Sequence, residues 1–386
     1  MGKETVALIK CDTYETNEVD KAVTEMLEML DGLDKLIKPG MKVFLKINLL
    51  MRKLPEEQVT TNPSVVAAVA RYIKKLGADV IVGDSPGGPF TEWMLKSVYE
   101  RCGITKMAAE ENLELNYDIS MIDVFYNDAV ILKKFTAVKA IYDADAVISM
   151  GKLKTHGMTA YTGAVKNMFG CIPGMIKAQY HYRMPQLKDF SNMLVDVEEY
   201  FKPVISIVDA VYAMEGDGPS AGTPRKVGAI IAGFNPHAVD TVAISLTNID
   251  PLTICTVKRA EERGLFSGKL SDVDLKGAKV EDLIVKDFKQ AKVHSTALLK
   301  GHVPKILEPL AHSLEKLMTT KPVIDENKCK GCKDCYNTCP PHTIQMVNGK
   351  AVINYDNCIK CFCCQELCPY KAIEIKKSWL LRMISR

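Results

Sequence analysis

The hydrophobic and polar positions before residue 321 follow two alternating patterns. Short runs of β-branched and other apolar residues, typical of buried strands, occur at Val6–Ile9, Val43–Ile47, Val80–Val82, Ala146–Met150, Val204–Val208 and Val227–Ala232. Stretches with the helical spacing of apolar side chains occur at Glu18–Leu30, Pro63–Leu76, Phe90–Arg101, Gly163–Phe169 and Ala238–Thr247. Apolar strands separated by amphipathic helices predict an α/β domain with a largely parallel sheet.

Three other segments complete the predicted organisation. Residues 175–200 are rich in polar and aromatic side chains (AQYHYRMP), which favours an insertion or a lid. Residues 287–321 have helical apolar spacing interrupted by Pro304 and Pro309, and we expect them to tether a second domain. We therefore predict an α/β domain at 1–320, a small α+β domain at 321–376 and a basic tail at 377–386.

Nine of the thirteen cysteines lie between Cys329 and Cys368. They form two copies of the pattern C-x2-C-x2-C-x3-C-P, CKGCKDCYNTCP and CIKCFCCQELCP, which begin at Cys329 and Cys358. Apolar pairs precede both copies at the same spacing, so the small domain is an internal duplication. Zinc sites use two CxxC pairs, whereas two runs of four cysteines that end in CP are typical of bacterial-type ferredoxins with two [4Fe–4S] clusters.

In two-cluster ferredoxins the fourth cysteine of each run binds the other cluster. This rule predicts one ligand set of Cys329, Cys332, Cys335 and Cys368, and a second of Cys339, Cys358, Cys361 and Cys364. Cys363 does not fit the pattern, and we expect its side chain to point away from the cluster that Cys364 binds. Since a purely structural role needs only one cluster, the duplication favours electron transfer.

The overall composition narrows the class of protein. Hydrophobic residues make up 47% and charged residues 25%, so the chain can bury a large core. The net charge of +3 gives no reason to expect nucleic acid or an anionic membrane as a partner. No apolar run approaches the ~18 residues of a spanning helix, and no N-terminal signal region is recognisable. We expect a cytoplasmic protein.

Polar residues cluster where the predicted strands end, which is where open α/β sheets bind ligands. Lys46 and Asn48 end one strand, and Asp84 and Ser85 follow the next. Asp209 ends a later strand and Asp217 lies between glycines soon after it. Each signal has a structural alternative that remains open: Lys46 could be a snorkelling surface residue, Asp84 and Ser85 a turn and helix cap, Asp209 a cap or buried partner, and Asp217 a tight turn.

The segment GKLKTHGMTAYTGAVKNMFG, residues 151–170, gives the strongest signal. If its start is extended, Lys152, Lys154 and His156 share one face. A helix after it would place Thr159, Gly163, Lys166 and Gly170 in one stripe and direct its free N–H groups at the same point. We expect an anion site with Lys154, His156 and Lys166 in catalytic roles. The expected binding residues are Lys46, Asn48, Asp84, Ser85, Lys152, Thr155, Asn167, Asp209 and Asp217.

The segments KINLL, TNPSVVAAVA, GDSPGG, GKLKTHGMTAYTGAVKNMFG, VDAVYAMEGDGPSAGTP and HAVDTVA occur in this order. Together they resemble the family called domain of unknown function three-six-two, whose members are often fused to a bacterial-type ferredoxin domain. The resemblance covers nearly the whole chain and implies an iron–sulfur protein of anaerobic bacteria or archaea. It implies no substrate.

Three functions follow from these patterns. The first is an oxidoreductase that passes low-potential electrons from two [4Fe–4S] clusters to a small anionic substrate or cofactor. The second is a non-catalytic electron carrier that docks a redox partner protein, and the third is a factor that delivers clusters or metal. Asp209 or Asp217 is a candidate ligand for a divalent metal, and flavin binding stays open because it needs no fixed short motif. No pattern specifies the substrate, the direction of electron flow or the oligomeric state.

Overall fold

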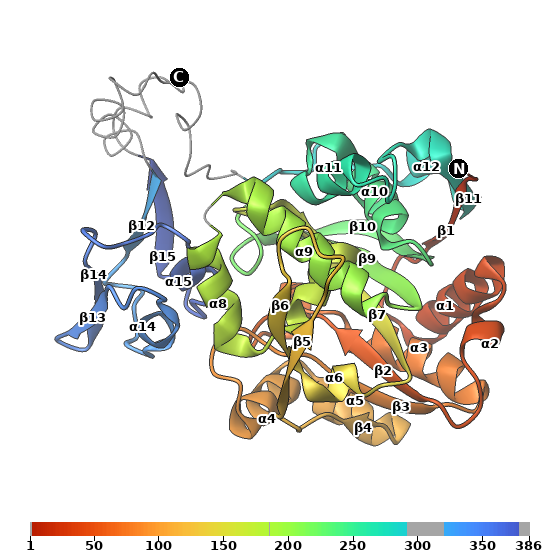
Figure 1. Cartoon of the computed structure of the whole chain (residues 1–386), viewed down its shortest axis with the longest axis horizontal. Helices are drawn as coiled ribbons and strands as arrows, with labels where there is room; N and C mark the ends of the chain where they lie inside the picture. The colour runs from red at the N-terminus through yellow and green to blue at the C-terminus, as the bar shows by residue number, and fades with distance from the viewer. Residues whose placement is uncertain (1, 185, 292–319, 378–386) are drawn as a thin grey trace.

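The computed structural model describes residues 2–184, 186–291 and 320–377. Figure 1 shows a large α/β domain with a smaller unit, which we call the ferredoxin module (residues 320–377), on one side of it. Most of the predicted tether and all of the predicted tail after Lys377 lie outside the described residues.

A mixed, mostly parallel nine-stranded sheet forms the centre of the α/β domain, in the order β11-β1-β10-β9-β7-β2-β3-β4, with β8 paired to β7. β2, β3, β4, β7 and β9 run parallel to their neighbours in this half of the sheet, whereas β10 is antiparallel to both β1 and β9. The strands are β1 (Glu4–Lys10), β2 (Lys42–Ile47), β3 (Asp79–Gly83), β4 (Glu114–Leu115), β7 (Ala146–His156), β8 (Ala160–Thr162), β9 (Ile205–Glu215), β10 (Thr223–Gly233) and β11 (Val273–Gly277). The predicted α/β class is confirmed.

Helices cover both faces of this sheet (Figure 1). One face carries α1 (Thr16–Leu30), α2 (Leu33–Leu36), α3 (Pro63–Lys75), α4 (Glu92–Arg101) and α5 (Ile104–Glu111). The other carries α7 (Ala164–Asn167), α8 (Gly174–Arg183), α9 (Leu187–Phe201), α10 (Pro236–Ser245), α11 (Cys255–Glu262) and α12 (Val280–Leu283). Both faces of the central strands are therefore buried, which explains why their sequences are continuously apolar.

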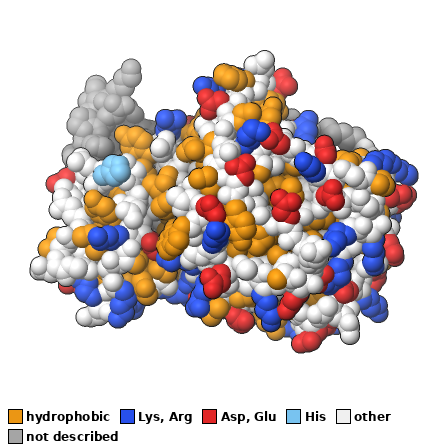
Figure 2. All heavy atoms as spheres, turned by 90° about the horizontal axis from the view of Figure 1, so that it is seen from below, with side chains coloured by type: hydrophobic (Ala, Val, Ile, Leu, Met, Phe, Trp, Pro, Cys, Tyr) orange, Lys and Arg blue, Asp and Glu red, His pale blue; other side chains and the backbone are white. Residues whose placement is uncertain are grey.

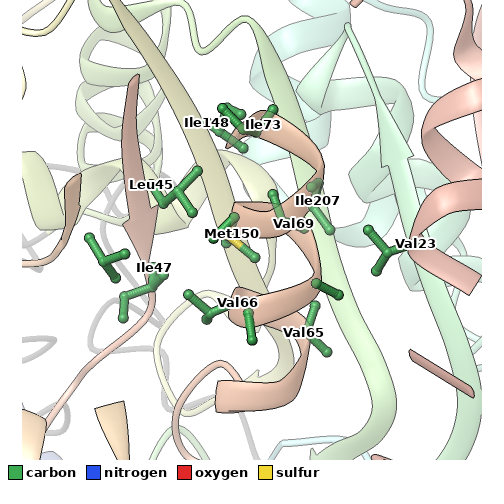
Figure 3. Close-up of a cluster of buried hydrophobic side chains, with 14 of the residues drawn as sticks. Val23, Leu45, Ile47, Val65, Val66, Val69, Ile73, Ile148, Met150 and Ile207 are labelled. Atoms are coloured by element: carbon green, nitrogen blue, oxygen red, sulfur yellow. The ribbon is translucent and has the colours of Figure 1, made fainter. Parts of the chain in front are cut away.

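Helix α3 illustrates how the sequence produces this packing. It begins at Pro63, whose fixed φ suits the first helical position, and the Asn62 side chain accepts a hydrogen bond from the Ser64 backbone N–H at 2.9 Å. Its valines at positions 65, 66 and 69 face the apolar side chains of β2, β7 and β9 (Figure 3). Val69 is fully buried, and such a side chain contributes roughly 1.5–3 kcal/mol.

Residues 175–200 form two helices, so the predicted insertion or lid needs correction. α8 borders the candidate site described below, but α9 is a core helix, with Phe190, Met193 and Leu194 fully buried. The polar residues that suggested a lid come largely from α8 and from the exposed side of α9. A hairpin of β5 (Met121–Phe125) and β6 (Lys134–Val138), followed by α6 (Lys139–Tyr142), packs beside α9 and was not predicted.

The ferredoxin module repeats one unit twice. β12 (Thr320–Ile324) pairs antiparallel with β15 (Ile373–Lys377), and β13 (Ile344–Val347) pairs with β14 (Lys350–Ile353). Each copy also has a short helix, α14 (Asp334–Thr338) in the first and α15 (Cys363–Glu366) in the second. Lys333 and Phe362, which precede these helices, both have positive φ, so even the backbone turns are duplicated.

The surface gives no further division of the molecule. On the face in Figure 2, lysine, arginine and acidic side chains are intermixed with apolar ones, as the net charge of +3 leads one to expect. Among the described residues, no helix combines the length and the apolarity needed to cross a bilayer.

Candidate functional site

Strand β7 continues through the predicted loop and ends at His156. All its residues are buried, and its pairing with β9 shifts register between Lys152 and Lys154. The extended conformation, which was the condition for placing these side chains on one face, is the one observed. The sequence thus places two lysines and a histidine inside the molecule, where each needs a partner.

Lys152 has a complete set of partners. Its Nζ lies 2.9 Å from Asp209 Oδ2 and donates to Gln58 Oε1 at 2.8 Å and to Tyr14 Oη at 2.6 Å. Asp209 also accepts from the Asn62 N–H at 3.0 Å. Burial lowers the pKa of Lys152, whereas the charge of Asp209 raises it. Because the oxygens of Asp209 are already used, the divalent metal suggested there has no free ligand atom, and this pair holds β7, β9 and α3 together.

Lys46, from β2, forms the second buried ion pair. Its Nζ lies 2.7 Å from Asp84 Oδ1 and 3.1 Å from Asn167 Oδ1. Asp84 also accepts from the Leu49 N–H at 2.8 Å, and Gly170 packs so closely that a Cβ there would lie 2.2 Å from Asp84 Oδ1. The structure therefore brings together the strand-end residues of β2 and β3 with the segment after β8, as the sequence indicated.

Lys154 differs from these two lysines because its hydrogen-bond acceptors are uncharged. Its Nζ donates to Asn48 Oδ1 and to the Val59 carbonyl, both at 2.6 Å. Burial lowers its pKa well below the ordinary value, and the charges of Lys166 and Lys152 lower it further. Lys166 is partly buried, with its Nζ 5.8 Å from the centre of the Phe169 ring, and burial lowers its pKa as well.

His156 meets a carboxylate from the ferredoxin module. Its Nδ1 accepts hydrogen bonds from the Met158 and Thr159 N–H groups, which leaves the proton on Nε2. Nε2 lies 3.4 Å from Glu366 Oε1. Burial lowers the pKa of His156 well below its usual value, and nearby lysine charge adds to this, so the imidazole is neutral at pH 7.

Glu366 anchors this end of the ferredoxin module. Its backbone carbonyl accepts from Ser220 Oγ at 2.5 Å. Burial raises the pKa of its carboxyl to about 7, while the charges of Lys166 and Lys154 oppose this rise. A second contact between the domains joins Arg52 and Asp334 at 3.7 Å. Asp334 and Cys363 occupy equivalent positions in the two repeats, so both short helices begin against the α/β domain.

Two predictions about the segment after β7 are wrong. The turn and strand β8 occupy residues 157–162, and helix α7 spans only Ala164–Asn167, so the predicted helical stripe does not form. The N–H groups of Ala164 and Val165 do not point at a ligand, because the carboxylate of Asp240 on α10 accepts from both, at 2.6 and 3.1 Å. Asp240 therefore accepts the hydrogen bonds at the start of α7 that the sequence analysis assigned to an anion.

The remaining predicted residues have mixed outcomes. Ser85 accepts from the Gly174 N–H at 2.7 Å and from Lys177 Nζ at 3.2 Å, which places it beside the lysines. Thr155 points to β9, where its hydroxyl donates to the Met214 carbonyl at 3.3 Å. Asp217 is exposed and lines a separate cavity of about 310 Å³ between the domains, with Gly157 and Gln365. Neither Thr155 nor Asp217 makes a described contact with the lysine cluster.

Lys177 and Glu366 belong to the site but were missed. Lys177, on α8, donates to the Ser85 carbonyl at 2.5 Å and to the Ile172 carbonyl at 2.8 Å. Burial lowers its pKa to about 7, although the charge of Asp84 opposes this. Its position four residues after Pro173, in a segment following the lysine-rich strand, is a weak signal. Glu366 gives no sequence signal of its own, because it lies within the cysteine pattern, two residues after the predicted ligand Cys364.

Positive charge exceeds negative charge in this buried region. The five lysines are Lys46, Lys152, Lys154, Lys166 and Lys177, and the three carboxylates that act on them are Asp84, Asp209 and Glu366. Two of the carboxylates are engaged by Lys46 and Lys152. Glu366 acts on Lys166 and Lys154, whereas Asp84, already paired with Lys46, acts on Lys177, so two positive charges lack a counter-ion when all five amines are protonated.

The cysteines of the ferredoxin module fit the crossed ligand assignment. Cys329, Cys332, Cys335 and Cys368 line one small cavity. Burial raises the pKa of Cys364, and charges on Cys361, Cys335, Cys358 and Cys339 raise it further, so the other three cysteines of the second set lie near Cys364. The donor sets thus suit two iron–sulfur clusters, which supply one-electron transfer when bound.

Backbone donors reach equivalent sulfurs in both repeats. The Thr343 N–H donates to Cys339 Sγ and the Ala372 N–H donates to Cys368 Sγ, both at 3.3 Å. Such hydrogen bonds favour a thiolate and adjust cluster potential. Cys363 corrects an expectation, because it is buried and its thiol interacts with Cys361, a predicted ligand, instead of lying apart from the ligand set. Its charge also acts on Lys166, so it lies between the ligand set and the lysines.

Known proteins resemble the chain over both parts. Residues 43–245 match the family described as Domain of unknown function (DUF362), and residues 321–369 match a 4Fe-4S dicluster domain. A thylakoid-associated protein of Synechocystis sp. is 31% identical over 326 residues, which cover 82% of this chain and 92% of that protein. Among solved structures, the apoprotein of a lactate racemase from Thermoanaerobacterium thermosaccharolyticum aligns with a TM-score of 0.37 and 12% identity, over 61% of this chain and 55% of its own.

These matches confirm the resemblance drawn from the sequence motifs. The family match includes β2, β3, β7, β9 and α10, and so contains every lysine of the site. The second match contains Glu366, the acidic residue that the ferredoxin module contributes to the site. The chain belongs to the family described as Domain of unknown function (DUF362), and it carries a 4Fe-4S dicluster domain after the α/β domain.

Proposed function

We propose that the chain is an iron–sulfur oxidoreductase that holds a small dianionic substrate or cofactor against Lys154, Lys166 and Lys177. The observation that carries this proposal is the burial of these three lysine amines, whose described partners leave two positive charges without a counter-ion when all five amines of the site are protonated. Buried charges are normally paired, and an anion of charge −2 supplies what the described side chains lack. The three lysines come from β7, α7 and α8, and the charge of Lys166 acts on both Lys154 and Lys177.

The position of the ferredoxin module supports electron transfer to this point. The turn that carries Cys361, Cys363 and Cys364 ends in Glu366, which faces the lysines and lies 3.4 Å from His156. A cluster held by this turn therefore lies on the side of the module next to the site. The neutral His156, protonated on Nε2, can donate a hydrogen bond to a bound anion. A redox partner protein exchanges electrons with the exposed side of the module.

Titration with sulfate tests the binding step, because sulfate stays a dianion over the pH range in which the protein folds. We expect saturable calorimetric binding by the wild type, and about tenfold to a hundredfold weaker binding by Lys166→Met, with cluster absorbance unchanged. Lys226, an exposed lysine on β10, provides the control Lys226→Met, which should bind as the wild type does. Equal affinity in all three proteins would refute a site at Lys166.

A second candidate function rests on Glu366. Its carboxylate already acts on Lys166 and Lys154, which supports an α/β domain that only docks the ferredoxin module of an electron carrier. This function requires no bound anion. It predicts that sulfate does not bind to the wild type at any concentration below the range of general salt effects, and that extraction of anaerobically purified protein releases no stoichiometric small anion.

A further inference from the structure

A second cluster of charged side chains joins α9 to α10, apart from the lysines. Glu198 and Glu199 are adjacent near the end of α9, and His237 lies in the first turn of α10. The side chains of Glu198 and His237 are each 2% exposed, and that of Glu199 is 19% exposed. One side of the cluster is therefore sealed in the core, whereas Glu199 connects the other side to solvent.

The distances in this cluster match the spacing of ligands around one ion. His237 Nε2 lies 3.1 Å from Glu198 Oε2 and 3.6 Å from Glu199 Oε1, and all three ligand atoms lie within 4.8 Å of one another. Ligands bound at ~2.0–2.2 Å to a first-row divalent ion lie roughly 3.0–3.6 Å apart. The side chains would need little movement to share a metal.

The hydrogen bonding of the cluster is incomplete in a way that an ion would correct. Neither His237 Nε2 nor Glu198 Oε2 has a hydrogen-bond partner of acceptable geometry, although they lie 3.1 Å apart. A cation bound by both atoms would satisfy them together. Buried polar atoms without partners are rare and cost about 1–3 kcal/mol each.

The charges around the cluster also favour a cation. Burial lowers the pKa of His237, but Glu198 and Glu199 raise it to about 9, so a divalent ion that binds here displaces a proton from the imidazole. Arg263, whose charge acts on Glu199, is paired with the fully buried Asp196 at 3.0 Å. Asn235 holds the start of α10, because its side chain accepts from the His237 N–H at 3.0 Å, so the imidazole is fixed relative to α9.

We propose that Glu198, Glu199 and His237 bind a divalent first-row transition metal ion that is distinct from the iron–sulfur clusters. One imidazole and two carboxylates suit Zn²⁺, Mn²⁺ or Fe²⁺. Asp240, one turn after His237, accepts from the N–H groups that begin α7, and α7 carries Lys166. A metal that fixes α10 to α9 therefore steadies the helix next to the lysine site. This proposal does not depend on the proposed redox function.

Equilibrium dialysis with Zn²⁺ tests the site in the cluster-loaded protein under anaerobic conditions, after EDTA treatment and a check that cluster absorbance is intact. We expect one Zn²⁺ per chain, at least about tenfold weaker binding by His237→Gln and Glu198→Gln, and a Zn²⁺-dependent rise in melting temperature that these variants lose. If the buried variants fold poorly, Glu199→Gln replaces them in this test, because Glu199 is partly exposed. Glu261→Gln, on the surface of α11, is the control. Equal Zn²⁺ binding by the wild type and Glu199→Gln, or none by either, would overturn the proposal.

Discussion

Replacing Lys152 by methionine should destabilise the fold, whereas replacing Lys154 should chiefly affect the binding of an anion. The two lysines are neighbours on the same face of β7, but only Lys152 has a carboxylate partner. Lys152 and Asp209 are both fully buried, with 2.9 Å between their charged atoms. Removing the lysine leaves the carboxylate of Asp209 in the core with hydrogen bonds but no counter-charge.

The expected size of the difference follows from these contacts. Breaking a buried ion pair by removing one partner costs about 3–5 kcal/mol, which is roughly 6–20 °C in melting temperature for a domain of this size. Lys154→Met leaves only two uncharged acceptors without a donor, which costs about 1–3 kcal/mol. Part of this cost is recovered, because burial of the Lys154 amine is itself unfavourable, as its lowered pKa indicates.

The assay is anaerobic thermal unfolding followed by circular dichroism, together with iron content and sulfate titration of each variant. We expect Lys152→Met to melt well below Lys154→Met, and Lys154→Met to lose most of its sulfate affinity while it stays folded with its clusters. Asp209→Asn in the Lys152→Met background should restore part of the lost stability, since it removes the unpaired charge. Equal melting temperatures for the two lysine variants, or no rescue, would show that the ion pair does not have the role assigned to it.

Three further outcomes are expected. The anaerobic protein should contain about eight irons, with the EPR signals of two reduced [4Fe–4S] clusters, and stoichiometric zinc in the cysteine sites would contradict this. Cys364→Ser should lose about half of the iron, whereas Cys363→Ser should keep it and change only the EPR signal or potential of one cluster. Sulfate affinity should fall as the pH rises from 6 to 8, because Lys177 loses its proton with a pKa of about 7 and Glu366 gains its negative charge with a pKa of about 7. Calorimetry in sulfate at constant ionic strength measures this, and an affinity that rises with pH would exclude these groups from the site.

The fold was predictable because its signals are local. Every predicted strand of the sheet is present, since parallel strands buried on both faces produce continuous apolar runs such as VFLKI in β2. The short β4 and the β5–β6 hairpin were missed because their exposed positions, such as Phe125, break the alternation that marks a strand. The predicted domain boundaries remain predictions.

The candidate site was predictable only in part, because its outcome depends on contacts between distant segments. The rule for strand ends correctly brings Lys46, Asp84 and Lys154 into one region. The same rule cannot distinguish a lysine that can bind a ligand from a lysine that already has a carboxylate partner, as Lys152 has in Asp209. Nor can it show that Asp240 would reach across from α10 to the start of α7.

Glu366→Gln distinguishes a binding site from a docking surface, because it removes the charge that the ferredoxin module contributes and keeps the side chain's shape. If the lysines bind an anion, losing a competing carboxylate should strengthen sulfate binding by about tenfold, which corresponds to about 1.4 kcal/mol. This value is modest for a charge beside Lys154, Lys166 and His156, because the Glu366 side chain is 12% exposed and solvent screens it.

If the lysines only dock the module, the same variant should instead loosen it. Among the described residues, the hydrogen bond of Ser220 to the Glu366 carbonyl and the packing of Leu367 against Gly87 would remain, as would the partly exposed pair of Arg52 and Asp334 at 3.7 Å. We would then expect faster proteolysis between the domains, a lower melting temperature and no sulfate binding. Asp334→Asn is the matched control, because it removes an interdomain ion pair without changing the charge next to the lysines. The exposed pair that it removes contributes at most about 1 kcal/mol. Stronger sulfate binding by Glu366→Gln, with proteolysis like that of Asp334→Asn or slower, would favour the binding site; faster proteolysis with no sulfate binding would refute it.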